Sequence, residues 1–175
     1  MKVSVACLIA TNLVLAPLVA RAEGRQDFFA ELAKTSTIQL GNKETEVKRK
    51  NGPAIVQFWA SWCVGCRVGM EKTIQKTGAA PGETSGGPSP RFISVSMDED
   101  PSAARKYLER SGEMATTLIE ATVVDTSQKL AEKLQVKAVP TMLFVHADGS
   151  IAGRIVGHGS PAEFDRLSKL ISQGH

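Results

Sequence analysis

The sequence contains too few cysteines for a fold held together by disulfide bonds. Of its three cysteines among 175 residues, Cys7 lies in an apolar N-terminal segment. The other two, Cys63 and Cys66, can close a loop of only four residues, which restricts the unfolded chain little. Secreted domains that depend on disulfides normally carry several pairs at wider spacing. A chemical role therefore explains this pair better than a stabilising one.

The chain also lacks a large excess of charge and, beyond its N-terminal segment, a long apolar run. Its formal net charge is +3, and it falls to +1 when Lys2 and Arg21 are removed with that segment. A balance so close to neutral gives no electrostatic attraction to nucleic acid. No apolar stretch after residue 22 is long enough to span a bilayer.

The N-terminal segment is typical of a secretory signal. Lys2 precedes an almost wholly apolar run over residues 3–19, and the Ala-Arg-Ala sequence ending at Ala22 fits a cleavage site. We expect cleavage after Ala22 and export of the mature protein, in a bacterium to the periplasm. An uncleaved membrane anchor is the alternative, and Asn12, Pro17 and the cleavage pattern argue against it.

The remaining chain is predicted to form one α/β domain. We divide the chain into a signal peptide over 1–22, an N-terminal extension with a hairpin over 23–50, and the main domain over 51–175. The apolar run 54–60 is typical of a strand buried on both faces, and residues 67–77 can form a helix. Early βαβ units and a late β-hairpin with a helix predict a mixed central β-sheet with helices on both faces. Further strands are expected over 91–97, 122–124, 141–145 and 151–156, and further helices over 27–34, 101–110, 126–134 and from 161 onward.

The order of strand, two-cysteine loop and helix places Cys63 at the N-terminus of a helix. Unpaired backbone N–H groups and the helix dipole stabilise a thiolate there, and cysteines in such motifs have lowered pKa values. We expect Cys63 to be the attacking thiolate and Cys66, more buried, to resolve the mixed disulfide that forms. Trp62 is expected to supply an apolar wall, and Val64 and Gly65 to tune the hydrogen bonds of the thiolate.

Other uses of a Cys-x-x-Cys motif fit the sequence less well. Attachment of a c-type haem needs a histidine directly after the motif, where this chain has Arg67. Structural zinc usually needs four ligands, and the three histidines His146, His158 and His175 form no close pair. A purely structural disulfide stays open as an alternative. We expect no metal and no cofactor besides the redox-active Cys63–Cys66 pair.

The segment IVQFWASWCVGC, followed by VKAVPTMLFVHADGS and GRIVGHGS, resembles the thioredoxin superfamily. The resemblance covers roughly residues 53–171 and implies a thioredoxin-like fold. The segment RFISVSMDEDPSAARKYLERSG is similar to the strand–helix insertion of the TlpA/ResA/CcmG branch of exported thioredoxin-like proteins. The same resemblance implies that Cys63 is the nucleophile and Cys66 the resolving cysteine.

The resemblance also implies roles for residues outside the motif. Pro140 corresponds to the proline that follows a cis peptide bond and packs against the disulfide. Val139 would offer backbone hydrogen bonds to an extended substrate. Gly157 corresponds to the glycine of a loop that borders the substrate groove, and Trp59 and Trp62 match the aromatic positions around the motif.

Gln57 departs from the family pattern. It stands where thioredoxins carry a buried aspartate that helps to move the proton of the resolving cysteine. The sequence therefore identifies no proton acceptor for Cys66, although Glu120 or water are candidates. His158 follows Gly157 and is either a contact for substrates or a solvated loop residue.

The sequence as a whole predicts an exported thiol–disulfide oxidoreductase. The TlpA-like resemblance implies the reducing direction, with client proteins that carry thiols or disulfides, as in cytochrome c or copper-site maturation. Because the periplasm is kept oxidising, a reductant there needs a membrane thiol-electron donor. A dithiol oxidase is one alternative. A non-catalytic metal- or haem-assembly chaperone with the same fold is another.

Overall fold

Strand β2 (Ala54–Trp59) lies at the centre of the fold, as its apolar sequence predicts. In the computed structural model it pairs in parallel with β3 (Arg91–Ser96) and antiparallel with β5 (Thr141–Val145). The sheet is mixed and has six strands in the order β1-β4-β3-β2-β5-β6. The remaining strands are β1 (Ile38–Gln39), β4 (Thr122–Val124) and β6 (Ile151–Val156). The structure describes residues 26–42, 47–48, 52–78 and 90–173.

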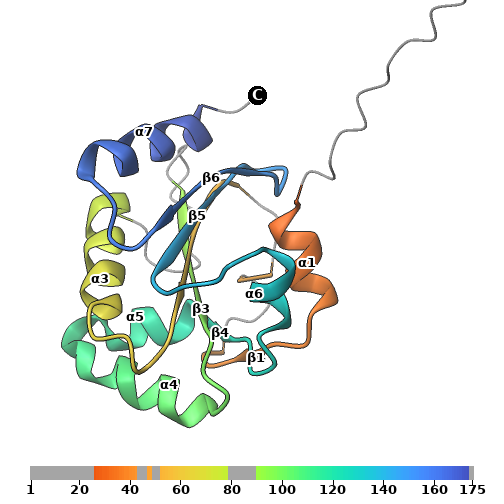
Figure 1. Cartoon of the computed structure of the whole chain (residues 1–175). Helices are drawn as coiled ribbons and strands as arrows, with labels where there is room; N and C mark the ends of the chain where they lie inside the picture. The colour runs from red at the N-terminus through yellow and green to blue at the C-terminus, as the bar shows by residue number, and fades with distance from the viewer. Residues whose placement is uncertain (1–25, 43–46, 49–51, 79–89, 174–175) are drawn as a thin grey trace, which may run out of the picture.

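Helices cover both faces of this sheet (Figure 1). On one face lie α1 (Phe28–Lys34) and α6 (Lys129–Lys133), and on the other lie α3 (Cys66–Thr77), α4 (Pro101–Leu108) and α7 (Pro161–Ser172). The predicted fold class is thus confirmed. A 3-10 helix over Glu109–Met114 and helix α5 (Ala115–Glu120) follow α4.

The side chains of β2 alternate between two apolar layers. Val56 and Phe58 pack with α1 and α6, while Ile55 and Trp59 pack with the helices of the opposite face. Gln57 shares that second face, because side chains two residues apart on a strand point the same way. Every residue of β2 is buried. The chain therefore leaves a rigid strand at Trp59 and enters the two-cysteine loop directly.

The helical boundaries differ from the prediction in two places. Helix α6 begins at Lys129 rather than at residue 126, because Gln128 has a φ of 56°, and a left-handed residue cannot continue a helix. Helix α4 ends at Leu108, and the 3-10 helix after it is interrupted at Gly112, whose φ is 57°. The sequence gives no expectation for α5, which packs in the same apolar cluster as α4.

The N-terminal extension predicted over 23–50 is joined closely to the main sheet. Phe28 and Leu32 of α1 are fully buried in the same core as β2, and β1 pairs antiparallel with β4. The predicted hairpin partner of β1 falls largely on residues 43–46, outside the described residues. The predicted signal over 1–22 also lies outside them. None of the helices in the described part of the chain has the length and hydropathy that a membrane crossing needs.

Asp125, which follows β4, makes folding stability depend on pH. Burial raises the pKa of its carboxyl, and backbone N–H groups at the start of α6 offset part of that rise; Ala131 N donates to Oδ2 at 2.9 Å. Because the folded pKa lies above the unfolded one, the stabilisation from protonated Asp125 is complete at low pH and is lost as pH rises through the folded pKa.

We therefore expect wild-type protein to lose stability relative to Asp125→Asn as pH rises, since the amide of the variant does not titrate. Urea unfolding of both proteins between about pH 3.5 and about pH 7 measures the difference. A difference in unfolding free energy that stays constant across this range would contradict the prediction.

Candidate active site

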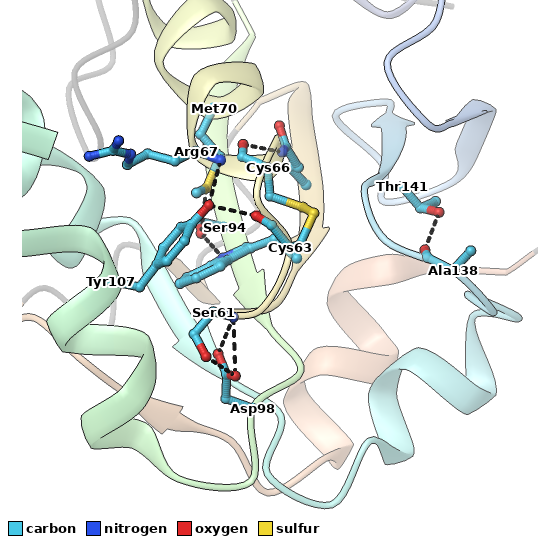
Figure 2. The surroundings of a disulfide bond; sticks show 12 residues. Ser61, Cys63, Cys66, Arg67, Met70, Ser94, Asp98, Tyr107, Ala138 and Thr141 are labelled. Atoms are coloured by element: carbon cyan, nitrogen blue, oxygen red, sulfur yellow. Dashed lines mark hydrogen bonds between the residues drawn. A yellow bond between two sulfur atoms is a disulfide. The ribbon is translucent and has the colours of Figure 1, made fainter. Parts of the chain in front are cut away.

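Cys63 and Cys66 form a disulfide between the end of β2 and the first turn of α3 (Figure 2). Their Cα atoms are 5.5 Å apart. Cys66 is fully buried against Met70 and Trp59, whereas Cys63 is only half-buried. The predicted difference in exposure is confirmed. The roles of the two thiols stay predictions.

The start of α3 corrects one detail of the sequence analysis. The helix begins at Cys66, so Cys63 lies in the turn before it rather than at the helix N-terminus. The N–H of Cys63 donates to the carbonyl of Ala60, and the N–H of Cys66 donates to the carbonyl of Cys63. Since the dipole effect falls off within a turn, it acts on Cys63 more weakly than predicted.

Gln57 lies beneath the cysteine pair, where the family resemblance places it. Its side chain is 1% exposed, and its Nε2 donates to the carbonyl oxygen of Cys66 at 3.1 Å. Its Oε1 is buried and has no hydrogen-bond partner among the described residues. Gly69, in the first turn of α3, lies next to this amide, since a Cβ there would be in van der Waals contact with Nε2 at 3.4 Å. Because an amide does not take up a proton at neutral pH, Gln57 supports the loop without serving as a base.

Glu120, a candidate proton acceptor for Cys66, directly precedes the loop into β4, and β3 separates β4 from β2 in the sheet. Its role in proton transfer stays a prediction. The Glu120 carboxylate accepts the N–H of Asn42 at 2.9 Å.

The loop before β5 has the geometry that the resemblance implies. The Val139–Pro140 peptide bond is cis, which confirms the prediction. Val139 packs against the apolar layer that contains Trp59, as Cys63 does. The N–H of Gly157 donates to the carbonyl of Pro140 at 2.8 Å, and its φ of 79° favours glycine at this position.

A hollow of about 600 Å³ lies beside the disulfide, between α3 and α7. Gly65, Pro140, Gly157 and His158 all line it. The imidazole of His158 lies directly against the two-cysteine loop, because a Cβ at Gly65 would be 2.8 Å from Nε2. His158 is therefore close to the site, a placement that the sequence leaves undecided.

Apolar side chains are exposed around Cys63. Trp62 is 71% exposed and Val64 is 92% exposed, so Trp62 forms open surface rather than a packed wall. Val68 on α3 and Val156 on β6 are also exposed. Trp59, in contrast, is fully buried, and its Nε1 donates to Ser94 Oγ at 2.6 Å.

Two residues that sequence analysis does not identify hold the two-cysteine loop. Asp98 accepts hydrogen bonds from the backbone N–H and the hydroxyl of Ser61, two residues before Cys63. Tyr107 of α4 donates to the carbonyl of Cys63. Both residues lie in the segment that resembles the strand–helix insertion, but 37 and 44 residues separate them from their partners, so no local pattern marks these contacts. The described residues contain no group of three His, Cys, Asp or Glu side chains that could hold a metal ion.

Comparison with curated proteins matches the chain to the thioredoxins. A family model described as a thioredoxin-like domain matches residues 40–171. Thioredoxin of Mycobacterium tuberculosis is 28% identical over 142 residues, which cover 79% of this chain and 92% of that protein. Chloroplastic thioredoxin M4 of Arabidopsis thaliana is 26% identical over 121 residues, which cover 64% of this chain. The match spans 60% of that relative, less than two thirds of its length.

A solved structure has the same fold. It is a thiol:disulfide interchange protein of the thioredoxin family from Chlorobium tepidum, with a TM-score of 0.51. The two chains are 23% identical, and the match covers 70% of this chain and 81% of that one. At this level of identity the likeness establishes the fold.

Proposed function

The chain belongs to the thioredoxin-like domain family, and on that premise we propose that it is an exported thiol–disulfide oxidoreductase that reduces disulfides in client proteins. The observation that carries the proposal is the Cys63–Cys66 disulfide, in which Cys63 is half-buried and Cys66 is fully buried. This asymmetry suits an attacking and a resolving cysteine. The loop lies at the end of a buried strand, which holds it in place.

The reduced protein acts in two exchange steps. The thiolate of Cys63 attacks one sulfur of the client disulfide, a Cys63–client disulfide forms, and the first client thiolate leaves. The thiolate of Cys66 then attacks the sulfur of Cys63, which forms the Cys63–Cys66 disulfide and releases the second client thiolate. Two electrons and two protons pass in total from the cysteine pair to the client. A thiol-electron donor, in the periplasm a membrane protein, must restore the dithiol.

The exposed apolar side chains around Cys63 favour clients with accessible apolar segments. Trp62 and Val64 flank the half-buried cysteine in sequence, and Val156 pairs with Thr141, the residue after Pro140. An extended client segment that contacts these side chains brings its disulfide to Cys63, and the family resemblance favours Val139 as the source of backbone hydrogen bonds to it. Apocytochromes c and copper-site assembly proteins are the client classes that the TlpA-like resemblance favours.

Export is supported by the sequence of the N-terminal segment. The apolar run over 3–19 and the Ala-x-Ala pattern that ends at Ala22 predict a mature chain that begins at Glu23. Mass spectrometry of the protein isolated from its host measures this terminus directly. An intact Met1 on a membrane-bound product would contradict cleavage and support an anchor instead.

Reduction of insulin by the dithiol protein tests the proposed activity. We expect wild-type protein, with dithiothreitol as the electron source, to precipitate the insulin B chain faster than dithiothreitol alone. Cys63→Ser is the matched control and should give the rate of dithiothreitol alone. Equal rates for wild type and Cys63→Ser would contradict the enzyme and favour a chaperone that holds clients without turnover.

A further inference from the structure

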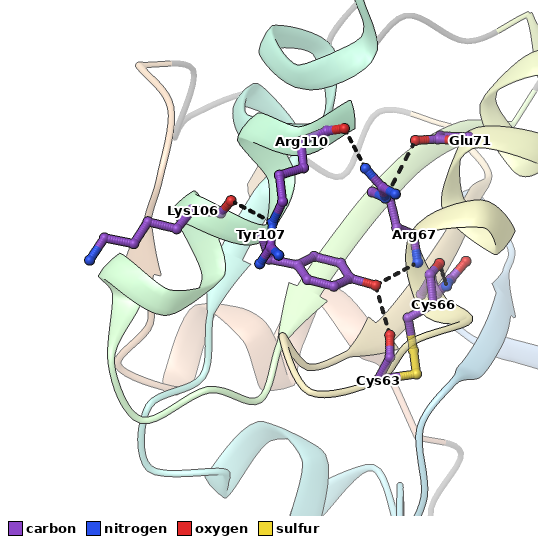
Figure 3. A network of polar contacts seen from close by, with 8 residues as sticks. Cys63, Cys66, Arg67, Glu71, Lys106, Tyr107 and Arg110 are labelled. Atoms are coloured by element: carbon purple, nitrogen blue, oxygen red, sulfur yellow. Dashed lines mark hydrogen bonds and ion pairs between the residues drawn. A yellow bond between two sulfur atoms is a disulfide. The ribbon is translucent and has the colours of Figure 1, made fainter. Parts of the chain in front are cut away.

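Tyr107 joins the two ends of the two-cysteine loop through a single hydroxyl (Figure 3). Its hydroxyl donates to the carbonyl oxygen of Cys63 at 2.7 Å and accepts the backbone N–H of Arg67 at 3.1 Å. The tyrosine is 8% exposed. Its ring stacks on the buried ring of Trp59, with 5.2 Å between centroids and 28° between planes. Packing of the ring therefore fixes the position of the hydroxyl.

The hydroxyl of Tyr107 caps the N-terminus of α3. The first N–H groups of a helix have no partner within the helix, and a Ser, Thr, Asp or Asn at the N-cap commonly supplies one. The N-cap of α3 is Gly65, which has no side chain. Tyr107, 40 residues after Arg67, supplies the missing acceptor from another helix.

Further contacts join α4 and the 3-10 helix after it to the start of α3. The guanidinium of Arg67 donates to the carbonyl of Arg110 and lies 4.0 Å from the carboxylate of Glu71. The guanidinium of Arg110 lies over the ring of Tyr107, 5.6 Å from its centroid. These contacts connect α4 and the 3-10 helix that follows it to the first turn of α3 (Figure 3).

We propose that Tyr107 is a positioning residue that keeps Cys63 beside Cys66 when the disulfide is open and thereby favours its closure. Both of its hydrogen bonds go to backbone atoms, at residues 63 and 67, and neither involves a sulfur. They can therefore persist in the dithiol. In the dithiol these bonds must also order the loop, whereas in the disulfide form the joined sulfurs already hold it, so the bonds stabilise the disulfide form by more than they stabilise the dithiol. This inference rests on the proposed exchange function.

The Tyr107→Phe variant tests the role of the hydroxyl alone. Phenylalanine keeps the ring that stacks on Trp59 and removes both hydrogen bonds. We expect the equilibrium constant for closing the Cys63–Cys66 disulfide to fall roughly threefold to tenfold, the change expected when the two bonds together are weaker in the dithiol by about the net free energy of one hydrogen bond. At 29.6 mV for each tenfold change, this is a shift of about 14–30 mV toward less negative reduction potentials.

Thr35→Val is the matched control. The Thr35 hydroxyl is buried and donates to the carbonyl of Glu31 at 2.8 Å, so valine also removes one hydroxyl-to-carbonyl hydrogen bond. Thr35 follows α1, on the sheet face opposite α3 and α4. We expect this variant to lose a similar amount of stability and to keep the wild-type equilibrium constant.

The measurement equilibrates each protein with dithiothreitol redox buffers and counts free thiols by alkylation and mass spectrometry. The inference is supported if the closing constant falls in Tyr107→Phe and keeps its wild-type value in Thr35→Val. An unchanged constant for Tyr107→Phe, or an equal fall for Thr35→Val, overturns it. If the wild-type protein failed to exchange with dithiothreitol at all, the proposed function would be overturned instead. That result differs from equal closing constants for wild type and Tyr107→Phe, because those constants are measured only in proteins that exchange.

Discussion

Cys66→Ser is expected to accumulate stable mixed disulfides with client proteins through Cys63, whereas Cys63→Ser is expected to lose all exchange activity. In the structure Cys66 is 0% exposed and Cys63 is half-buried, so of the two cysteines a client disulfide can reach only Cys63. Without Cys66, the mature chain that we expect after cleavage at Ala22 has no second thiol to release the client. The captured clients are visible as high-mass bands on non-reducing gels and disappear when the samples are reduced.

The two serine variants control for each other, because each keeps one cysteine and replaces the other by the same, slightly smaller side chain. Brief alkylation of the reduced wild type at neutral pH adds an independent measure of which thiol is reactive. We expect peptide mapping to find the label on Cys63 first. Earlier labelling of Cys66, or client capture by Cys63→Ser, would reverse the assignment of the two roles.

Asp98→Ala is expected to cause the largest loss of stability outside the apolar core. The carboxylate is 7% exposed and accepts the N–H of Ser61 at 3.0 Å and the hydroxyls of Ser61 and Ser96 at 2.7 Å each. These bonds tie Ser61 to the end of β3, and Figure 2 shows those between Ser61 and Asp98. Alanine would leave the donors without their charged acceptor.

We expect Asp98→Ala to lower the free energy of unfolding by about 2–4 kcal/mol, since each buried donor left unpaired costs about 1–3 kcal/mol and nearby water recovers part of the loss. Asp98→Asn keeps one acceptor oxygen and the side-chain volume, so its loss should be about half as large. Urea unfolding of the three proteins gives these values. A loss below about 0.5 kcal/mol for Asp98→Ala would show that the network does not support the loop.

The parts of the site that sequence predicted well have strong local signals. The apolar run 54–60 and the helix-forming residues after Cys66 place the two-cysteine loop between a buried strand and a helix, where the structure has it. The cis bond before Pro140 was predicted from the family motif rather than from periodicity. These features depend on neighbours in sequence or on one short motif.

The parts that sequence missed depend on contacts between distant residues. Tyr107 lies 44 residues after Cys63, and Asp98 lies 37 residues after Ser61, so nothing in either segment indicates the contact. His158 meets Gly65 for the same reason, because packing of α7 and β6 against α3 brings them together. The position of Cys63 relative to the helix differs from the prediction, because a turn separates Cys63 from the start of α3 at Cys66.

The reduction potential of the Cys63–Cys66 couple is the most direct test of the proposed reducing role. Equilibration of the purified protein with dithiothreitol or glutathione buffers, followed by alkylation and mass counting, gives this potential. A reductant should have a value more negative than about −200 mV, toward the roughly −270 mV of thioredoxin. A value near the roughly −120 mV of the oxidant DsbA would contradict the reducing direction and assign the same chemistry to a dithiol oxidase.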